Sequence, residues 1–209
     1  MTDSVDALFS TPLPGIKRPL SNLEADQITK YLNLLTKWQK THRLVGSVEL
    51  GWLIENVVMD SLSFLEVLPP AAQHIADIGS GAGVPGISIA ITRPNIGVTL
   101  VEPRRRRASF LATVIRELGL HHVHVAGVRV EALGASYTES FDAAVMRCAG
   151  SVESILPEVF RIVRKGGTVV AASAPGQSPE RAGGAVEVAA GPGRVRTLRV
   201  LQKPLSADP

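Results

Sequence analysis

The chain has a single cysteine, Cys148, among its 209 residues. One thiol can form neither an intramolecular disulfide nor a structural zinc site with several thiolates, and such sparse cysteine suits a reducing compartment. The sequence also lacks any apolar run that approaches the ~20 residues needed to span a bilayer. Its first residues carry acids where a secretory signal has a basic segment. These absences predict a soluble, cytoplasmic protein with no membrane partner.

A strong excess of charge is missing as well, because 22 Lys and Arg residues face 19 Asp and Glu residues, which gives a net charge of +3. Any nucleic-acid partner would therefore bind a local basic surface. The 45% hydrophobic and 20% charged residues are ordinary for a globular protein, and the length allows one large core. Nothing in the sequence marks a symmetric interface, so we expect a monomer.

Three segments differ in their residue patterns. Residues 1–20 are rich in Ser, Thr and Pro, and we expect them to form a flexible arm. Residues 21–70 open with Ser21 and Glu24 at capping-box spacing, and apolar side chains then recur with helical periodicity. This pattern predicts a helical N-terminal region. Residues 71–209 instead alternate short apolar strands with helices, which indicates a separate domain.

The alternation in residues 71–209 predicts right-handed crossovers, and hence a parallel sheet with helices on both faces. The end of the chain differs, because "GAVEVAAGPGRVRTLRVLQK" has the pattern of two strands joined by a tight turn. We therefore expect an α/β, Rossmann-like fold whose mostly parallel sheet ends in an antiparallel C-terminal hairpin.

The segment "ADIGSGAGVPG" lies between a predicted strand and a predicted helix. Its glycines Gly79, Gly81 and Gly83 permit positive φ angles and let backbone N–H groups approach a ligand closely. The last two, together with Gly86, satisfy the G-x-G-x-x-G pattern of dinucleotide sites, and Glu102 follows at the required spacing. A nicotinamide-dependent oxidoreductase is therefore one candidate function.

Two features favour an S-adenosylmethionine site instead. Asp77 lies at the strand end just before the glycines and should face the crevice where ligands bind. Its carboxylate suits an ammonium or sulfonium group and opposes a pyrophosphate. The later "RIVRKGGTVV", followed by a hairpin edge, matches the second half of S-adenosylmethionine-dependent methyltransferases. Glu102 can accept hydrogen bonds from both ribose hydroxyls of either cofactor, so it does not discriminate between them.

From about Tyr31 to Lys203, the sequence carries a series of more specific motifs, namely "KWQKTHRL", "MDSL", "DIGSGAGVPGISIAI", "RPNIGVTLVEP", "RVEAL", "FDAAVMRCAGS" and "GGTVVAAS". In these the chain resembles the glucose-inhibited division protein B family, bacterial methyltransferases that modify guanine N7 in small-subunit ribosomal RNA. The resemblance implies a class I methyltransferase sheet, S-adenosyl-L-methionine as cofactor, and ribosomal RNA or the small ribosomal subunit as partner.

The resemblance also implies roles for individual residues. Gly79 and Val84 would line the methionine and ribose side of the site, although Val84 could equally be a core residue. Val130 and Glu131 would border the adenine, and Arg147 would lie beside the cofactor and target. The full expected cofactor-binding set is Asp77, Gly79, Gly81, Gly83, Val84, Glu102, Val130, Glu131 and Arg147.

No general base or metal is expected for such a reaction. Guanine N7 offers an in-plane lone pair and bears no proton at neutral pH, so methyl transfer needs only proximity, orientation and charge stabilisation. Arg147 would then position the target or the cofactor. The chain has no evident Ser-His-Asp arrangement, and the histidines near residue 122 alternate along a strand rather than follow a metal-ligand spacing.

Four consecutive arginines, Arg104, Arg105, Arg106 and Arg107, open a predicted helix. Cations there are disfavoured by roughly 0.3–1 kcal/mol each, because the helix macrodipole is positive at its N-terminus. The last two match a basic pair of the family, whereas the first two are additional. They could be solvated, or all four could bind RNA phosphates. Further basic residues could extend this face, namely Arg93, Arg43 and Lys40, but their relative placement cannot be derived from sequence.

The chain departs from the family in three places, one of which is a helical stretch after the fifth strand that is shortened to "SPERAG". Asn56 and Val57 stand where the family commonly has a histidine, and Pro175 stands where a lysine is expected. Loss of a lysine near the pocket would weaken contacts to the substrate. A non-catalytic RNA-binding homologue of the methyltransferase fold is therefore a third candidate function.

Overall fold

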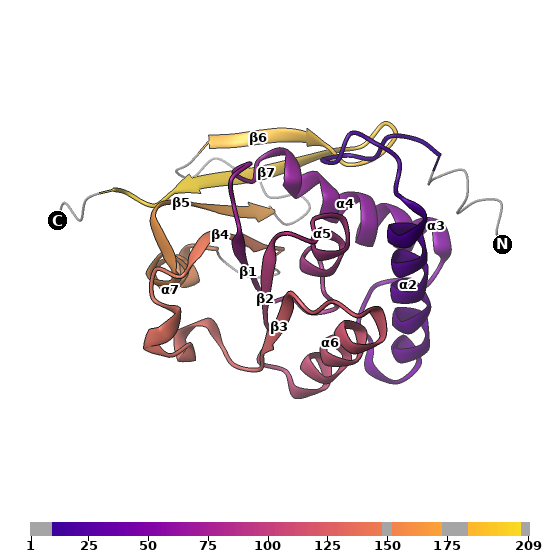
Figure 1. Cartoon of the computed structure of the whole chain (residues 1–209), viewed down its shortest axis with the longest axis horizontal. Coiled ribbons are helices and arrows are strands. Elements are labelled where there is room, and N and C mark those ends of the chain that lie inside the picture. Colours follow the sequence, from indigo (N-terminus) through magenta and orange to yellow (C-terminus); the bar gives the residue numbers. More distant parts are fainter. Residues whose placement is uncertain (1–9, 148–151, 173–183, 206–209) are drawn as a thin grey trace.

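The computed structural model describes residues 10–147, 152–172 and 184–205. In these residues, one seven-stranded sheet has the order β3-β2-β1-β4-β5-β7-β6. The strands are β1 (His74–Ile78), β2 (Gly97–Val101), β3 (Val123–Ala126), β4 (Phe141–Met146), β5 (Val163–Ala172), β6 (Gly184–Ala189) and β7 (Val195–Gln202). Strands β1 to β5 are parallel, and β7 runs antiparallel to both of its neighbours. The predicted mostly parallel sheet with an antiparallel C-terminal hairpin is confirmed (Figure 1).

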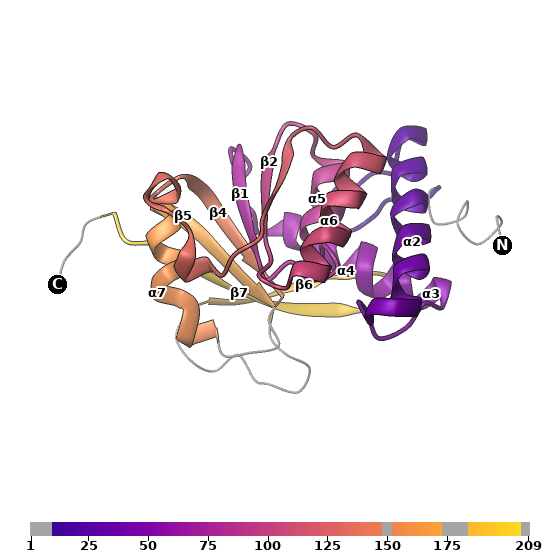
Figure 2. The same ribbon diagram turned by 90° about the horizontal axis from the view of Figure 1, so that it is seen from below.

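Helices cover both faces of the sheet, as the crossover pattern predicts. Helices α2 (Asn22–His42), α5 (Gly86–Thr92) and α6 (Arg105–Leu118) lie together on one side, and α7 (Val152–Ile162) lies on the other (Figure 2). A hydrophobic core lies on each face of the sheet. Alternate residues of β1 point into these two cores, with Ile75 on the α2, α5 and α6 side and Ala76 on the α7 side. Within the described ranges, no helix is long and apolar enough to cross a membrane.

Four short helical segments follow one another directly between α2 and the sheet. They are α3 (Leu50–Leu53), the π-helical η1 (Ile54–Met59), α4 (Asp60–Leu62) and the 3₁₀-helical η2 (Ser63–Glu66). Glu49 caps the first, since its carboxylate oxygens accept hydrogen bonds from the N–H groups of Gly51 and Trp52. A π-helical turn inside a helix is rare and frequently marks a functional site.

The described part of the expected arm, residues 10–20, is packed rather than loose. Leu13 and Leu20 are buried, and the Gly15 N–H donates to Glu66 Oε1 at 3.0 Å. Gly15 has a φ of +70°, and a Cβ there would lie 2.0 Å from the Leu62 carbonyl oxygen, so only glycine fits. The Ser, Thr and Pro content of the segment concealed these few anchoring residues.

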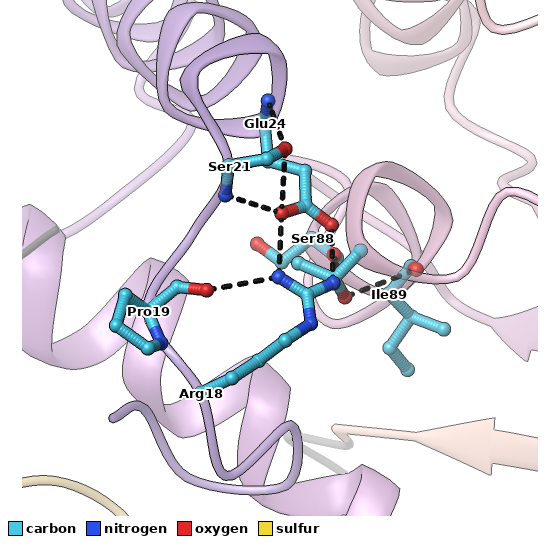
Figure 3. Close-up of polar contacts among 7 residues, drawn as sticks. Arg18, Pro19, Ser21, Glu24, Ser88 and Ile89 are labelled. Carbon is cyan, nitrogen blue, oxygen red and sulfur yellow. Dashed lines mark hydrogen bonds and ion pairs between the residues drawn. The ribbon is translucent and has the colours of Figure 1, made fainter. Parts of the chain in front are cut away.

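Arg18 fastens this segment to α2. Its guanidinium donates to both carboxylate oxygens of Glu24, at 2.8 and 2.7 Å, and to the Pro19 carbonyl (Figure 3). Glu24 Oε2 also accepts the Ser21 N–H at 2.7 Å, and the Ser21 hydroxyl accepts the Glu24 N–H, which is the predicted capping box. One buried carboxylate therefore fixes both the start of α2 and the arm.

We expect Glu24→Gln to lower the free energy of unfolding by about 1.5–3 kcal/mol at pH 7, because it weakens hydrogen bonds to a charged group. Hydrogen bonds from Arg18 lower the pKa of Glu24. The stabilisation is thus present above the ordinary Glu pKa and is lost as the pH falls through the lowered value. Urea unfolding at pH 7 and pH 3 should show the two proteins converging in acid. The exposed Asp26→Asn is the control, and an equal effect of both variants at pH 7 would contradict this role for Glu24.

Candidate functional site

The carboxyl ends of three neighbouring parallel strands meet at one edge of the sheet. Ile78, which ends β1, pairs with Val101 of β2 and with Met146 of β4. The residues that follow these strand ends are Gly79, Glu102 and Arg147. The strand order reverses between β1 and β4, and open α/β sheets bind ligands in the crevice at such a switch point. Three sequence-predicted site residues thus come together where a ligand is expected.

The glycine-rich loop after β1 has two parts with different purposes. Gly79, Gly81 and Gly83 all have positive φ angles, of 72°, 57° and 94°. A Cβ at Gly79 would meet nothing within 4 Å, whereas a Cβ at Gly83 would lie 2.5 Å from Ile87 Cγ1. The first glycine therefore faces open space that a ligand can occupy, and the third allows close packing.

Gly86, the first residue of α5, is the tightest of these positions. A Cβ there would lie 2.4 Å from Leu100 Cδ2 and 2.6 Å from Asp77 Oδ2. Its own N–H donates to Asp77 Oδ2 at 3.0 Å. The short helix therefore starts directly against β1 and β2, and this contact sets the height of the glycine-rich loop above the strand ends.

Asp77 does not face the crevice as expected. It is fully buried, and its Oδ2 is directed at the Gly86 N–H under the start of α5. The other oxygen, Oδ1, is buried without a hydrogen-bond partner in the described part of the chain. The pKa of Asp77 is raised to about 7, chiefly by burial and to a smaller extent by the charge of Glu102, while the hydrogen bond from the Gly86 N–H opposes the rise. The side chain acts as an N-terminal acceptor for α5, which strand-end position alone could not reveal.

Glu102 is 3% exposed and ties two loops together. Its Oε2 accepts the Gly81 N–H at 2.9 Å, and its Oε1 accepts the Arg104 N–H at 2.8 Å. One carboxylate thus joins the glycine-rich loop to the start of α6. Its negative charge also lies beside the arginines that open this helix and partly compensates them.

Arg147 is oriented by the π-helical turn in the N-terminal region. Its Nη1 donates to the Asn56 carbonyl oxygen at 2.5 Å, and its Nε lies 3.3 Å from Asp60 Oδ2. Asp60 is 1% exposed, and its Oδ1 also lies 3.5 Å from Nη1 of Arg196 on β7. Two guanidinium groups from distant segments therefore share one buried carboxylate.

Sequence reasoning missed this cluster, apart from Arg147 and the departure at Asn56. Arg194, in the turn before β7, donates to Glu55 Oε2 at 2.9 Å and to Asn56 Oδ1 at 3.1 Å. The only sequence signals were the "MDSL" motif and the two arginines of "GRVR", which gave no hint that they meet.

Tyr31 is a further site residue, which the sequence analysis named only as the start of the family resemblance. Its side chain is fully buried, and its hydroxyl donates to the Ala82 carbonyl oxygen, inside the glycine-rich loop, at 2.8 Å. Helix α2 therefore contacts the loop directly, so the N-terminal region is part of the site.

The remaining predicted residues lie around this centre. Val84 is 9% exposed and belongs to the apolar core, as the alternative interpretation held. Val130 is buried on the α7 side of the sheet, with its carbonyl held by Arg161 Nη2, and Glu131 is exposed. Both belong to a 3₁₀ turn that follows the carboxyl end of β3. They share the edge of the sheet with the glycine-rich loop but are not drawn into its hydrogen bonds.

The four arginines surround the first turn of α6. Arg104 is the N-cap residue, and no side chain caps the helix. Arg104, Arg105 and Arg106 are exposed, whereas Arg107 is half-buried. The Nη1 atom of Arg107 lies 3.6 Å from where a Cβ of Gly81 would be. The side chains of Arg104 to Arg106 are therefore exposed to solvent, whereas the guanidinium of Arg107 lies next to the glycine-rich loop.

Residues 24–189 match the family model described as GidB, rRNA small subunit methyltransferase G. A relative from Alkalilimnicola ehrlichii, named ribosomal RNA small subunit methyltransferase G, is 34% identical over 95% of this chain and 88% of its own length. A relative of the same name from Sorangium cellulosum is 36% identical over 77% of this chain and 71% of its own.

The chain belongs to the GidB family. The resemblance inferred from the motifs is thereby confirmed, and the oxidoreductase alternative is wrong. Two solved structures show the same fold at low identity. TYW2 of P. horikoshii has a TM-score of 0.57 at 13% identity, over 72% of this chain and 63% of its own. A SAM-dependent methyltransferase from Aquifex aeolicus has a TM-score of 0.53 at 15% identity, over 71% and 92%.

In this GidB chain, we expect Gly86→Ala to destabilise the fold by about 1–3 kcal/mol, because the added methyl group overpacks the contact with Leu100 and Asp77. Gly79→Ala should cost less, about 1 kcal/mol, because only its positive φ opposes a side chain. Urea unfolding of both variants would measure the difference. A Gly79 variant at least as destabilised as the Gly86 variant would show that the loop is packed where we describe it as open.

We also expect the stability of the wild type to fall between pH 5 and pH 8. The pKa of Asp77 is about 7 in the folded state and ordinarily about 3.9, so the folded chain binds the extra proton over this range and loses stability as it is released. Asp77→Asn should remove the decline, which urea unfolding at the two pH values would measure. Asp142→Asn is the control, because the pKa of Asp142 is lowered and this group stays ionised throughout. A decline unchanged by Asp77→Asn would refute the assignment.

Proposed function

We propose that this chain transfers the methyl group of S-adenosylmethionine to N7 of a guanine in small-subunit ribosomal RNA. One observation carries the proposal beyond family membership. The open space over Gly79 lies at the switch point of a methyltransferase-type sheet, between the buried Glu102 and the oriented Arg147. RNA of the small subunit is named for the family, and guanine N7 follows from the motif resemblance.

The residues at this edge suit the cofactor chemically. Asp77 is fully buried beneath the glycine-rich loop, so it contributes negative potential under this edge but does not contact the ligand. Glu102 stands where both ribose hydroxyls could donate to it. Val130 and Glu131, after β3, would border the adenine, and the backbone of Gly79 would lie along the methionine portion.

S-adenosylmethionine supplies a methyl group on a positively charged sulfur. In the transfer, the bond from carbon to sulfur breaks as the bond from guanine N7 to the same carbon forms. The N7 lone pair provides the electrons, and the sulfur keeps the pair of the broken bond. No proton moves, so the chain needs no general base. Its residues instead hold the donor and acceptor in line, a contribution that reaches ~7–11 kcal/mol in favourable systems.

Arg147 suits a positioning role beside the target. The guanine becomes cationic as it is methylated, and an isolated guanidinium would repel that charge. Asp60 lies 3.3 Å from Arg147 and offsets the repulsion, so the arginine can still donate hydrogen bonds to a base or a phosphate. The Asn56 carbonyl fixes the direction of the guanidinium.

The departure at Asn56 and Val57 does not remove this arrangement. Arg147 is held by the backbone carbonyl of Asn56, which any residue provides, and the Asn56 side chain adds contacts of its own to Arg194 and to the Trp52 carbonyl. Pro175 lies outside the described residues. The contacts that are described favour an active enzyme over a non-catalytic homologue.

We propose that RNA phosphates bind next to this site, at Arg104, Arg105, Arg106 and Arg107. They lie at a helix N-terminus, where backbone N–H groups also favour an anion. An rRNA substrate places the enzyme in the cytoplasm, and nothing in the proposed reaction requires more than one copy of the chain.

Calorimetry would test the cofactor directly. We expect S-adenosylhomocysteine to bind with 1:1 stoichiometry and NAD not to bind. Binding of NAD at the same site, or of neither compound, would refute the cofactor assignment.

Methyl transfer itself would be measured with labelled S-adenosylmethionine and small ribosomal subunits from a strain that lacks this enzyme, followed by nucleoside analysis for 7-methylguanosine. We expect Arg147→Gln to lower kcat at least tenfold, a loss of about 1.4 kcal/mol or more in transition-state stabilisation. The exposed Arg116→Gln, at the far end of α6, should leave it unchanged. Tight S-adenosylhomocysteine binding without incorporation of label would establish the non-catalytic alternative.

A further inference from the structure

Helices α2 and α6 lie side by side and run in opposite directions (Figure 2). Near the start of α2, Gln27 Nε2 donates to the carbonyl of Leu118, the last residue of α6, at 2.9 Å. Toward the other end of α2, the Trp38 ring lies 5.5 Å from the ring of Phe110, in the second turn of α6. The carboxyl end of α2 therefore lies beside the amino end of α6.

This packing brings together two basic segments that are far apart in sequence. The exposed cations at the adjoining helix ends are Lys37, Lys40, Arg43, Arg104, Arg105 and Arg106. We call them the α2–α6 basic surface. The rest of the helix pair is less basic, because the exposed acids Asp26 and Glu117 there balance the exposed cations Lys30 and Arg116.

The side chains of this surface have no acidic side chain paired with them in the described part of the chain. Within the described ranges, none of them forms an ion pair. Arginines elsewhere commonly do, among them Arg18, Arg116, Arg161 and Arg164. A cluster of unpaired cations in a chain whose net charge is only +3 marks the local basic region that a nucleic-acid partner would require.

The position of the surface ties it to the candidate site. Helix α6 begins three residues after Glu102, at the carboxyl edge of the sheet, and Arg107 leans from its first turn over Gly81. The α6 arginines oppose the macrodipole of their own helix, whereas Lys40 and Arg43 lie at the favourable end of α2. An RNA phosphate near the start of α6 would stabilise both the arginines and the free N–H groups of the first turn.

We propose that the α2–α6 basic surface is one continuous binding site for the sugar-phosphate backbone of RNA, next to the nucleotide that is methylated. The inference rests on the proposed function for its RNA substrate. It goes further in assigning half of the contact to Lys37, Lys40 and Arg43 of the N-terminal helix. Helix α2 thus has two roles, since its buried face holds the glycine-rich loop through Tyr31 and its exposed end holds the RNA.

The test compares two double variants on the same pair of helices. Lys37→Gln with Lys40→Gln removes charge at the proposed surface, and Lys30→Gln with Arg116→Gln removes the same charge away from it. Affinity for naked small-subunit ribosomal RNA would be measured over a salt series. We expect the first variant to bind at least tenfold more weakly, with the slope of log K against log salt reduced by about 1.4, or about 0.7 for each lost phosphate contact. The second should bind as the wild type does.

A third variant, Arg104→Gln with Arg105→Gln, tests continuity. If the surface is one site, a protein that carries all four substitutions should show the sum of the slope reductions of the two double variants. An unchanged slope for the Lys37 and Lys40 variant, alongside a reduced slope for the Arg104 and Arg105 variant, would overturn the proposal and leave α6 alone as the RNA contact. Equal losses of RNA affinity in the first and second variants would also overturn the proposal, because the effect of removing charge would then not depend on its position.

Two further readouts separate this inference from the proposed function. Affinity for S-adenosylhomocysteine should be the same in all variants, because none of the changed residues touches the glycine-rich loop. Suppose that the wild type binds RNA but transfers no methyl group, and that the Lys37 and Lys40 variant loses RNA binding. This result would support the surface and refute the reaction. Methyl transfer by a Lys37 and Lys40 variant with wild-type RNA affinity would support the reaction and refute the surface.

Discussion

The carboxylate of Glu102 links the segments that follow β1 and β2 at the carboxyl edge of the sheet. It is buried at the end of β2, where an unpaired charge would be costly, and it is satisfied by the Gly81 and Arg104 backbone N–H groups. These two hydrogen bonds set the shape of the glycine-rich loop and the start of α6 at once. The same negative charge allows four arginines to crowd a helix N-terminus that would otherwise repel them. The glycine-rich loop and the start of α6 therefore depend on a single side chain.

The N-terminal region completes the site instead of merely covering it. Tyr31 holds the glycine-rich loop from one side, and Asn56 and Asp60 hold Arg147 from the other. Both contacts are buried or partly buried, so they are expensive to break once formed. The helical segment and the sheet consequently act as one unit around the crevice, although their sequence patterns separate cleanly at about residue 70.

Much of this could be derived from the sequence because it depends on local patterns. Alternating strands and helices determine the sheet, and glycines at a strand end determine the loop. Position after a strand was enough to place Glu102 and Arg147 at one edge. Position was not enough for Asp77, because the choice between crevice and helix start depends on how closely α5 approaches β1. The packed arm likewise depends on Leu13 and Gly15 meeting partners far along the chain.

Contacts between distant segments could not be foreseen at all. Asp60 meets Arg147 and Arg196 only because the π-helical turn, β4 and β7 converge, and no local pattern encodes that convergence. The adjacency of the two basic helix ends has the same origin, in the packing of Trp38 on Phe110. The residues missed were therefore those whose placement depends on tertiary contacts.

A crystal structure of the protein with S-adenosylhomocysteine tests the central claim most directly. The account predicts the ligand over Gly79, with both ribose hydroxyls directed at Glu102 and the amino group on the Asp77 side of the loop. A ligand bound away from this edge, or a ribose that makes no contact with Glu102, would contradict it.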